Sequence, residues 1–370
     1  MGIWRRMTAI TLLVASAAGC TPMPCTSSRT EVVFERSRPP VQESFKIGLL
    51  LPESETTRYE KFDRPYITEA VKRNCPNCTL VYNNANQDPV RQQQQIDAML
   101  AAGVEVLILD AVDAEAIAPS VKKAEQQGVK IVAYDRLADG PIHAYSSIDN
   151  VEVGKMQGQA LLDALRAGGN PFRGPIVMIN GSPEDPSARD FKKGAHQVLD
   201  GHVMIGREYD TPDWSPERAK IQASGAFATL GADRVIGVYS ANDGMAGGIA
   251  DAMKTAGVPK GTPLTGQDAD LAAIQRILLG TQTMTIYKPI KPEAESAVRM
   301  AIDLAAGRPV KAPSTVSNDT VSRIPAMIIA PMVVTRDNIK DTVVRDGFWT
   351  VTEICAPKNV QEACESTGLT

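Results

Sequence analysis

The sequence predicts an α/β protein built from two doubly wound parallel sheets. Short apolar runs rich in β-branched residues recur from residue 46 onward, and segments with an apolar stripe at helical spacing lie between them. This alternation is typical of βαβ units with right-handed crossovers. A chain of 370 residues is long enough for about two domains of common size, so we expect two sheets rather than one wide sheet.

The expected elements follow one another in a regular order. The expected strands are residues 47–51, 80–82, 104–109, 130–134, 176–179, 203–205, 235–239, 264–266 and 283–287. The expected helices are residues 91–102, 114–127, 153–166 and 246–256, and each ends at a glycine or a turn. We place the break between the sheets near residues 147–150, where a strand ends and a helix begins. We expect the ligand to bind between the two sheets.

The beginning of the chain predicts export and lipid anchoring. Residues 1–19 contain two arginines, an apolar run too short to span a bilayer and a row of small residues, as in a secretory signal peptide. Cys20 follows Ala-Ala-Gly, which resembles the lipobox of bacterial lipoproteins, so we expect Cys20 to be lipidated. The alternative is a secreted protein with a chance cysteine there. Residues 20–44 would form a flexible tether to the periplasmic side or outer face of a membrane.

The remaining cysteines predict two local disulfides in an oxidising compartment. Cys75 and Cys78 lie in a turn, and Cys355 and Cys364 lie in the polar tail at residues 351–370. A redox CxxC motif or a zinc site is the alternative for the first pair. However, zinc would need a second pair nearby, and the redox motif usually opens a helix after a strand. Cys25 is left over.

Composition excludes several function classes. Apolar residues make up 43% of the chain, as in ordinary globular proteins. Lys and Arg number 39 against 43 Asp and Glu, a net charge of −4, and no basic stripe suggests nucleic-acid binding. The sequence has no GxSxG motif, no P-loop and no calcium loop, and its three histidines are scattered. We therefore expect a non-catalytic protein without metal or cofactor, which binds a neutral or weakly polar ligand.

Polar and aromatic residues follow the carboxyl ends of the expected strands. Because ligands of open α/β sheets bind at these ends, we expect the side chains to meet in one crevice. They are Arg58, Tyr59, Asp135, Arg136, Asp185, Ser187, Arg189, Trp214, Asn242, Asp268 and Lys288. Such a set suits a sugar, since carboxylates accept from hydroxyls, cations donate and an aromatic ring covers a C–H face. For any single carboxylate, a surface salt bridge or a helix cap is the alternative.

Several segments resemble the xylose-binding members of the bacterial periplasmic sugar-binding family, the substrate-receiving components of ABC importers. The segments are Ala-Tyr-Asp-Arg at 133–136, Asn-Asp at 242–243, Gly-Gln-Asp-Ala-Asp at 266–270, and residues 280–289 and 339–348. The resemblance implies two Rossmann-like lobes that are joined by a three-strand hinge and close on the sugar. The implied crossings lie near residues 147–150, 287–289 and 324–328. The implied lobes are residues 46–148 plus 289–325 and residues 149–288 plus 326–350.

The resemblance also implies roles for the candidate residues. Trp214 would stack on the sugar ring, and Tyr59 would form an aromatic wall where the family tends to have Trp. The implied hydrogen-bonding groups are Arg58, Asp135, Arg136, Asp185, Asn242, Asp268 and Lys288. Ser187 stands where the family is expected to have Asn. The shorter side chain has one hydrogen-bond donor fewer, and Arg189 nearby would compensate for that loss. We therefore expect D-xylose to be the preferred ligand, followed by other aldopentoses or hexoses.

The resemblance implies a monomeric, lipid-anchored protein that delivers its closed, sugar-bound form to the permease of an ABC importer. A sensor that presents the same closed form to a membrane receptor is the alternative. A sugar-acting enzyme is the rival class: Asp135 and Asp268 would be the carboxylates of a glycosidase, but Arg136 and Lys288 would keep them ionised. Sugar-responsive repressors share this fold but carry a DNA-binding domain at the position of the expected signal peptide and tether, so we do not expect a repressor.

Overall fold

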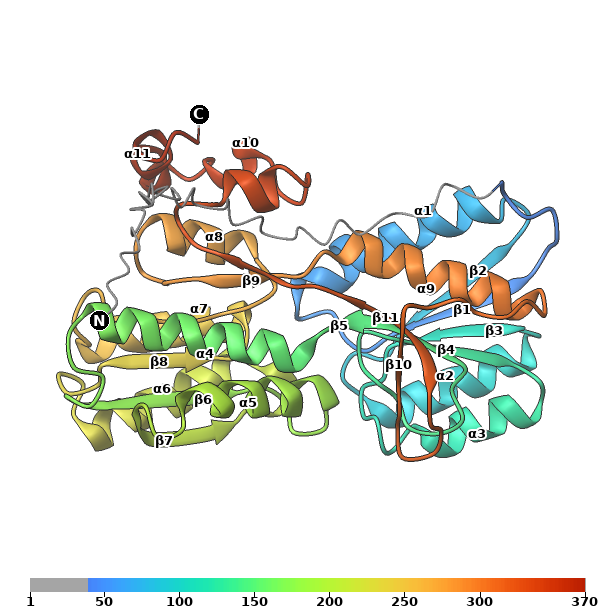
Figure 1. Ribbon diagram of the computed structural model, residues 1–370, viewed down its shortest axis with the longest axis horizontal. Helices are drawn as coiled ribbons and strands as arrows, with labels where there is room; N and C mark the ends of the chain where they lie inside the picture. Colours follow the sequence, from blue (N-terminus) through green and yellow to red (C-terminus); the bar gives the residue numbers. More distant parts are fainter. Residues whose placement is uncertain (1–38, 370) are drawn as a thin grey trace, which may run out of the picture. The chain divides into compact units, whose positions relative to one another are not determined.

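The computed structural model describes residues 39–369 (Figure 1). The expected signal peptide, the expected lipidation site Cys20, Cys25 and most of the expected tether lie outside the described residues. The described chain contains two lobes, each built on its own sheet. In Figure 1 the first lobe carries the labels β1 to β5 and the second carries β6 to β8.

The first lobe of the described chain is built on a seven-stranded sheet in the order β10-β11-β5-β4-β3-β1-β2. Its strands are β1 (Lys46–Leu51), β2 (Thr79–Asn84), β3 (Val106–Leu109), β4 (Lys130–Tyr134), β5 (Ala144–Ile148), β10 (Ser314–Val316) and β11 (Ile324–Ile329). Neighbouring strands are parallel, apart from the antiparallel pair β10 and β11. The parallel core agrees with the sequence prediction.

Helices cover both faces of this sheet because its strands are apolar on both sides. Leu49 of β1 packs with one face and Leu50 with the other, as the two-residue period of a strand requires. One face is covered by the π-helical turn η1 (Tyr59–Asp63), α1 (Arg64–Asn74) and α9 (Ile290–Ala305). The other face is covered by α2 (Pro89–Ala101) and α3 (Ala118–Gln126).

The second lobe of the described chain combines a three-stranded parallel sheet, β7-β6-β8, with the antiparallel pair β9 and β12. Its strands are β6 (Pro175–Asn180), β7 (Met204–Asp210), β8 (Gly237–Ser240), β9 (Thr285–Tyr287) and β12 (Met332–Val334). Its helical elements are α4 (Asn150–Ala167), α5 (Pro186–Leu199), η2 (Pro212–Trp214), α6 (Pro216–Leu230), α7 (Asp243–Ala256) and α8 (Leu271–Leu278). The expected strand at 264–266 is reduced to one parallel bridge, between Val238 and Leu264.

The chain passes between the lobes three times in the described residues. It crosses from β5 to α4, from β9 to α9, and from β11 to β12. The last crossing differs from the sequence interpretation, which assigned residues 326–350 to the second lobe. β11 pairs with β5 in the first sheet as far as Ile329, so the boundary lies after this residue, because the hydrogen-bonded strand keeps the segment in the first lobe.

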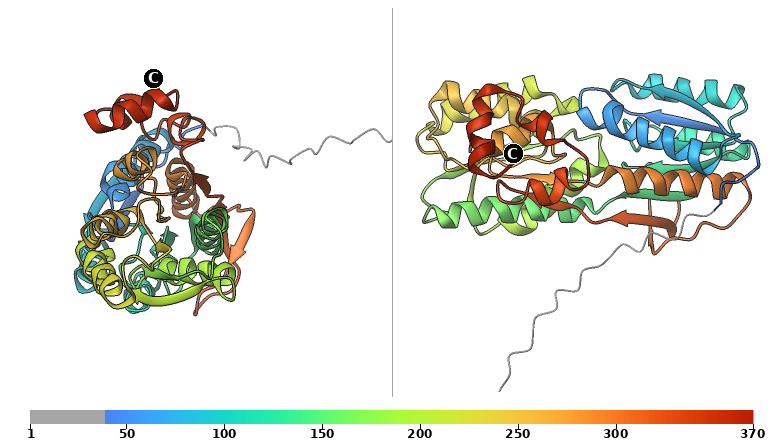
Figure 2. Two further views of the ribbon diagram at one scale, coloured as in Figure 1. Left: turned by 90° about the vertical axis from the view of Figure 1, so that its left-hand side faces the viewer. Right: turned by 90° about the horizontal axis from the view of Figure 1, so that it is seen from above.

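The expected polar tail is a folded cap on the second lobe. It contains α10 (Val351–Ile354) and α11 (Lys358–Ser366), and the π-helical turn η3 (Lys340–Val344) precedes it. Ile354, Val360 and Leu369 are buried in a cluster with α8, and the right-hand view of Figure 2 shows both helices over this lobe. Disulfides join Cys355 to Cys364 in this cap and Cys75 to Cys78 after α1.

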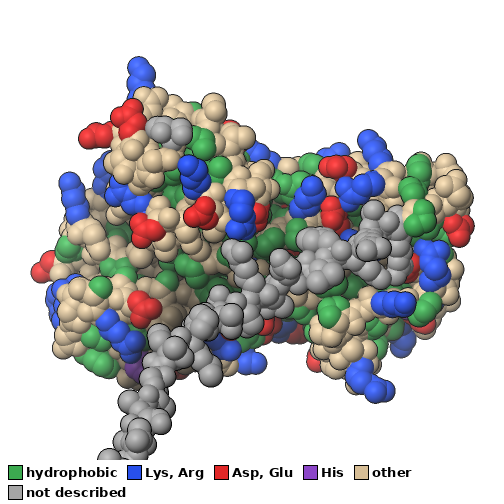
Figure 3. Space-filling model, turned by 45° about the horizontal axis from the view of Figure 1, so that its top comes forward, with side chains coloured by type: hydrophobic (Ala, Val, Ile, Leu, Met, Phe, Trp, Pro, Cys, Tyr) green, Lys and Arg blue, Asp and Glu red, His purple; other side chains and the backbone are tan. Residues whose placement is uncertain are grey.

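The surface shows mixed charge. On the face shown in Figure 3, Lys and Arg side chains are interspersed with Asp and Glu. Among residues 39–369, no helix is both long and apolar enough to cross a bilayer.

Candidate functional site

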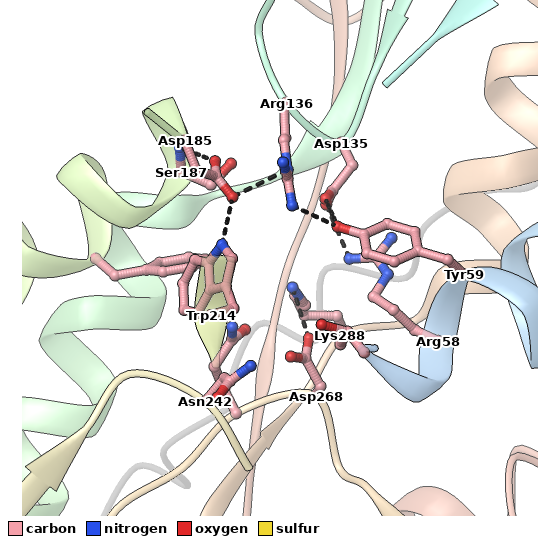
Figure 4. A pocket seen from close by; sticks show the side chains of 13 residues that line it. Arg58, Tyr59, Asp135, Arg136, Asp185, Ser187, Trp214, Asn242, Asp268 and Lys288 are labelled. Atoms are coloured by element: carbon pink, nitrogen blue, oxygen red, sulfur yellow. Dashed lines mark hydrogen bonds and ion pairs between the residues drawn. The ribbon is translucent and has the colours of Figure 1, made fainter. Parts of the chain in front are cut away.

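A cavity of about 280 Å³ lies between the two lobes. The first lobe contributes Thr56, Arg58, Tyr59, Asp135 and Arg136, and the second contributes Asp185, Ser187, Phe191, Trp214, Asn242, Gln267 and Asp268. Lys288 comes from the crossing between β9 and α9. Figure 4 shows these side chains converging from both sides.

Strand ends and helix starts place these residues. Asp135 and Arg136 directly follow β4, and Lys288 directly follows β9. Asp185 is the N-cap of α5, where its Oδ1 accepts a hydrogen bond from the Ser187 N–H at 2.8 Å. Asn242 caps α7 in the same way through the Met245 N–H at 2.9 Å. The capping bonds fix the polar side chains at the mouth of each helix.

Arg58 is held rigidly by three carboxylates. Its Nη1 lies 2.8 Å from Asp135 Oδ1, and its Nη2 lies 2.7 Å from Asp63 Oδ1 and 3.3 Å from Glu293 Oε2. The Tyr59 hydroxyl donates to Asp135 Oδ2 at 3.2 Å. These groups are all buried, so the charge of Arg58 is balanced by carboxylates of the same chain.

Arg136 links the two lobes. Its Nε lies 2.9 Å from Asp185 Oδ2 in the second lobe and 3.6 Å from Asp110 Oδ1 in the first. The Trp214 indole N–H also donates to Asp185 Oδ2, at 3.1 Å. On the opposite side of the cavity, Lys288 Nζ lies 2.8 Å from Asp268 Oδ1.

Three cavity residues have left-handed backbones. The φ angles are 55° for Asp135, 55° for Trp214 and 95° for Asp268. Non-glycine residues in this region cost of order 1–3 kcal/mol each, and such strain clusters at ligand sites. The Asp135 carbonyl oxygen is held by the hydroxyls of Tyr145 and Ser147, at 2.8 Å and 2.6 Å. The surrounding structure therefore imposes the orientation of these side chains.

Trp214 forms the apolar wall of the cavity. Its ring lies edge-on to Phe191, with centroids 6.3 Å apart. Gly181 lies against the same ring so closely that a Cβ atom there would be 2.1 Å from the indole. The Trp214 ring can therefore occupy this position only if residue 181 is glycine.

Burial and ion pairing set the charge states of the cavity carboxylates. Burial alone would raise the pKa of Asp135, but Arg58, Lys288 and Arg136 outweigh it and lower the pKa to about 2. For Asp185, burial outweighs the opposing effect of Arg136 and raises the pKa. Asp135 thus remains an ionised acceptor across the physiological range.

The structure brings together ten of the eleven predicted site residues and separates one. Arg189 does not line the cavity: its side chain is half-exposed, and its Nη1 pairs with Glu115 Oε1 at 3.0 Å. It therefore does not compensate for the shorter Ser187 as expected. The reason is helical geometry, since Arg189 lies two positions after Ser187 and projects from a different face of α5.

Sequence reasoning missed three lining residues, Thr56, Phe191 and Gln267. Phe191 lies four positions after Ser187 on α5, so helical spacing could have indicated it. Gln267 precedes Asp268, and its Oε1 is buried with no hydrogen-bond partner in the described part of the chain. The carboxylates behind Arg58 were missed as well, because Glu293 lies far away in the sequence. Within residues 39–369, no three His, Cys, Asp or Glu side chains are arranged so that they could hold a metal ion.

Three comparisons relate this chain to known proteins. A family model described as "Periplasmic binding protein domain" matches residues 47–309. The D-xylose-binding periplasmic protein of Escherichia coli strain K12 is 35% identical over 315 residues, covering 84% of this chain and 92% of that protein. The protein of the same name from Haemophilus influenzae is 32% identical over 314 residues, covering 83% and 91%. A carbohydrate transporter solute binding protein from Chloroflexus aurantiacus, solved with D-glucose, has a TM-score of 0.76 and 25% identity, covering 84% of this chain and 98% of that one.

Proposed function

This chain belongs to the periplasmic binding protein family, and we propose that it captures an uncharged monosaccharide, D-xylose first, between its lobes and delivers the closed form to an ABC importer. Its relatives named above are sugar-binding transport proteins and not enzymes. The observation that carries the proposal is the cavity itself, where paired cations and carboxylates from both lobes surround an indole wall.

The chemistry of the cavity supports a sugar. Each sugar hydroxyl both donates and accepts, and Asp135 and Asp268 accept while Arg136 and Lys288 donate. Trp214 and Phe191 cover the weakly apolar C–H faces of a pyranose. A ligand without a matching hydroxyl would leave a buried charged group unsatisfied, which gives selectivity.

The two-lobed lining supports a closing mechanism. A sugar bound to the first lobe reaches Asp185, Asn242 and Asp268 only when the lobes are together, so it binds the closed form more tightly. To shift the ratio of closed to open protein from 1:99 to 99:1, the sugar must bind the closed form more tightly by roughly 5.5 kcal/mol. Two or three hydrogen bonds to charged groups, at about 1.5–3 kcal/mol each, are enough.

Ser187 argues for a tolerant site. Its Oγ accepts a hydrogen bond from Asn150 Nδ2 at 3.1 Å, and its hydroxyl has one hydrogen-bond donor fewer than the expected Asn amide. Arg189 does not line the cavity, since its Nη1 pairs with Glu115 Oε1 at 3.0 Å. We therefore expect D-xylose to bind together with at least one other aldose.

Calorimetric titration with D-xylose, L-arabinose, D-ribose, D-glucose and D-galactose tests the proposal. We expect Asp268→Asn to weaken D-xylose binding by about a hundredfold, because it removes a charged acceptor and leaves Lys288 unpaired. Asp97→Asn, which changes an exposed carboxylate of the first lobe, is the matched control and should bind as the unchanged protein does. Absence of heat with every sugar, or chemical conversion of the sugar, contradicts the proposal.

The lipid anchor and the importer are tested separately. Cys20→Ala should move the protein from the membrane fraction to the soluble fraction, and mass spectrometry should find a diacylglyceryl group on the unchanged protein only. A sugar-loaded protein that raises the ATPase rate of its cognate permease complex supports import. A sugar-loaded protein without this effect supports the sensor alternative.

A further inference from the structure

An aromatic contact joins the two lobes away from the cavity. The Phe62 ring stacks on Phe348, with centroids 4.0 Å apart and planes at 21°, and meets Trp349 edge-on at 5.3 Å. All three rings are buried. Lys61 Nζ lies 4.0 Å above the Trp349 ring and 3.6 Å from Glu353 Oε1. In the described chain, none of these residues lines the cavity.

The partners in this contact belong to different lobes. Phe62 lies on η1, which leads into α1, and α1 packs into the first lobe through Ile67 and Val71. Phe348 and Trp349 follow η3 and pack with α8 and β12 of the second lobe. Phe62 is therefore a first-lobe side chain inserted into a second-lobe cluster. If the lobes separate as rigid bodies, this contact breaks.

The same segments carry cavity residues on both sides. Phe62 shares its helical turn with Tyr59 and follows Arg58 closely. On the other side, the Trp349 indole N–H donates to the Ala269 carbonyl oxygen at 2.7 Å. Ala269 directly follows Asp268, and both have left-handed φ angles, 52° and 95°. A strained backbone keeps its conformation only where its surroundings impose it, and the Trp349 bond is one such restraint.

We propose that Trp349 is a positioning residue for the sugar-binding carboxylate Asp268, and that Phe62 docks on Phe348 and Trp349 when the lobes close. Closure and the placement of Asp268 are then coupled through one aromatic contact. The contact also favours the closed form independently of the sugar, since separating the lobes exposes to water the Phe62 ring and the faces of Phe348 and Trp349 that it covers. This inference rests on the proposed sugar-binding function.

The first test removes the docking ring. Phe62→Ala should weaken the apparent affinity for D-xylose by about tenfold or more, mainly through faster dissociation, because the closed form loses its aromatic contact. Phe62→Leu keeps part of the apolar volume, so its affinity for D-xylose should lie between those of the unchanged protein and Phe62→Ala. Phe172→Ala, which removes an exposed ring of the second lobe, is the matched control and should leave affinity unchanged.

Small-angle X-ray scattering at saturating sugar separates docking from a general effect on folding. The unchanged protein should become more compact with sugar, and Phe62→Ala should do so less completely. Affinity and compaction equal to those of the unchanged protein in Phe62→Ala would overturn the docking step. An equal loss in Phe62→Ala and Phe172→Ala would overturn it as well.

The second test is a double-mutant cycle on D-xylose affinity. Trp349→Phe keeps an aromatic ring, although a smaller one, and removes the N–H donor, and we expect D-xylose affinity to weaken by about tenfold. In an Asp268→Asn background the same change should have little further effect, because the carboxylate that it positions is absent. Additive losses would overturn the positioning role. An unchanged protein that binds no aldose would instead refute the proposed function.

Discussion

Asp110 offers a sharp test of the electrostatics around the cavity. It directly follows β3, is fully buried, and neither carboxylate oxygen has a hydrogen-bond partner among residues 39–369. Arg136 Nε lies 3.6 Å from its Oδ1 but closer, at 2.9 Å, to Asp185 in the other lobe. Burial, reinforced by Asp135, raises the pKa of Asp110 well above its usual value. We predict that Asp110→Asn stabilises the folded protein.

The expected gain follows from the missing partners. An unsatisfied buried polar group costs about 1–3 kcal/mol, and more when it is charged. Since the folded protein holds the Asp110 proton more tightly than the unfolded chain, stability falls as pH rises above about 4, the value in an unfolded chain. The fall is at most about 1.4 kcal/mol per pH unit and ends at the folded pKa. Asp110→Asn abolishes this dependence.

Urea unfolding of the sugar-free protein at pH 4.5, 6.0 and 7.5 measures the effect. The free energy of unfolding of Asp110→Asn should exceed that of the unchanged protein by about 1–3 kcal/mol at pH 7.5, and by less at pH 4.5. Asp97→Asn, an exposed change, should show no such trend. A variant that is less stable by the same amount at each pH would refute the reasoning and would mean that the Asp110 charge supports Arg136.

Three further predictions concern other parts of the fold. Gly181→Ala should displace the Trp214 ring, since a Cβ atom would lie 2.1 Å from it; we expect at least about tenfold weaker sugar binding by calorimetry and a stability loss of about 1–3 kcal/mol. Burial tends to lower the pKa of His196, but hydrogen bonds to two carboxylates raise it overall. His196→Gln should therefore cost under about 1 kcal/mol below pH 6.5, and the difference should vanish as pH rises through the folded pKa, by thermal unfolding. Cys355→Ser with Cys364→Ser should lower the stability of the C-terminal cap by about 2–3 kcal/mol, seen as earlier proteolysis there.

The sequence was sufficient for the layout of the cavity but not for the contacts behind it. Residues after strand ends converge wherever a parallel sheet forms, so Asp135, Asn242 and Asp268 could be placed without coordinates. Asp63 and Glu293 could not, because their approach to Arg58 depends on how η1 and α9 pack on one sheet face. Arg189 was misplaced because its position on α5 depends on where the helix begins.

The fold, like the cavity, could be predicted from the sequence only in part. Strands β1 to β4 and β6 to β8 could be predicted from periodicity, whereas the expected strands do not include β5, β10, β11 or β12, and the end of β11 depends on its pairing with β5. The tail after residue 350 appeared polar, yet Ile354 and Val360 are buried. A few apolar residues spaced among charged ones are enough for a short helix to pack when a disulfide ties it to its neighbour, as Cys355 at the end of α10 and Cys364 in α11 do.

The three cations of the cavity are already neutralised by carboxylates of this chain, and this has a consequence for which solutes can enter. A uronic acid or a sugar phosphate brings a negative charge that would find no unmatched cation, only acidic neighbours such as Asp135 and Asp268. Its water of hydration would be lost without replacement. We therefore expect the cleft to admit neutral carbohydrates and to exclude their ionised derivatives, even where these share the same ring.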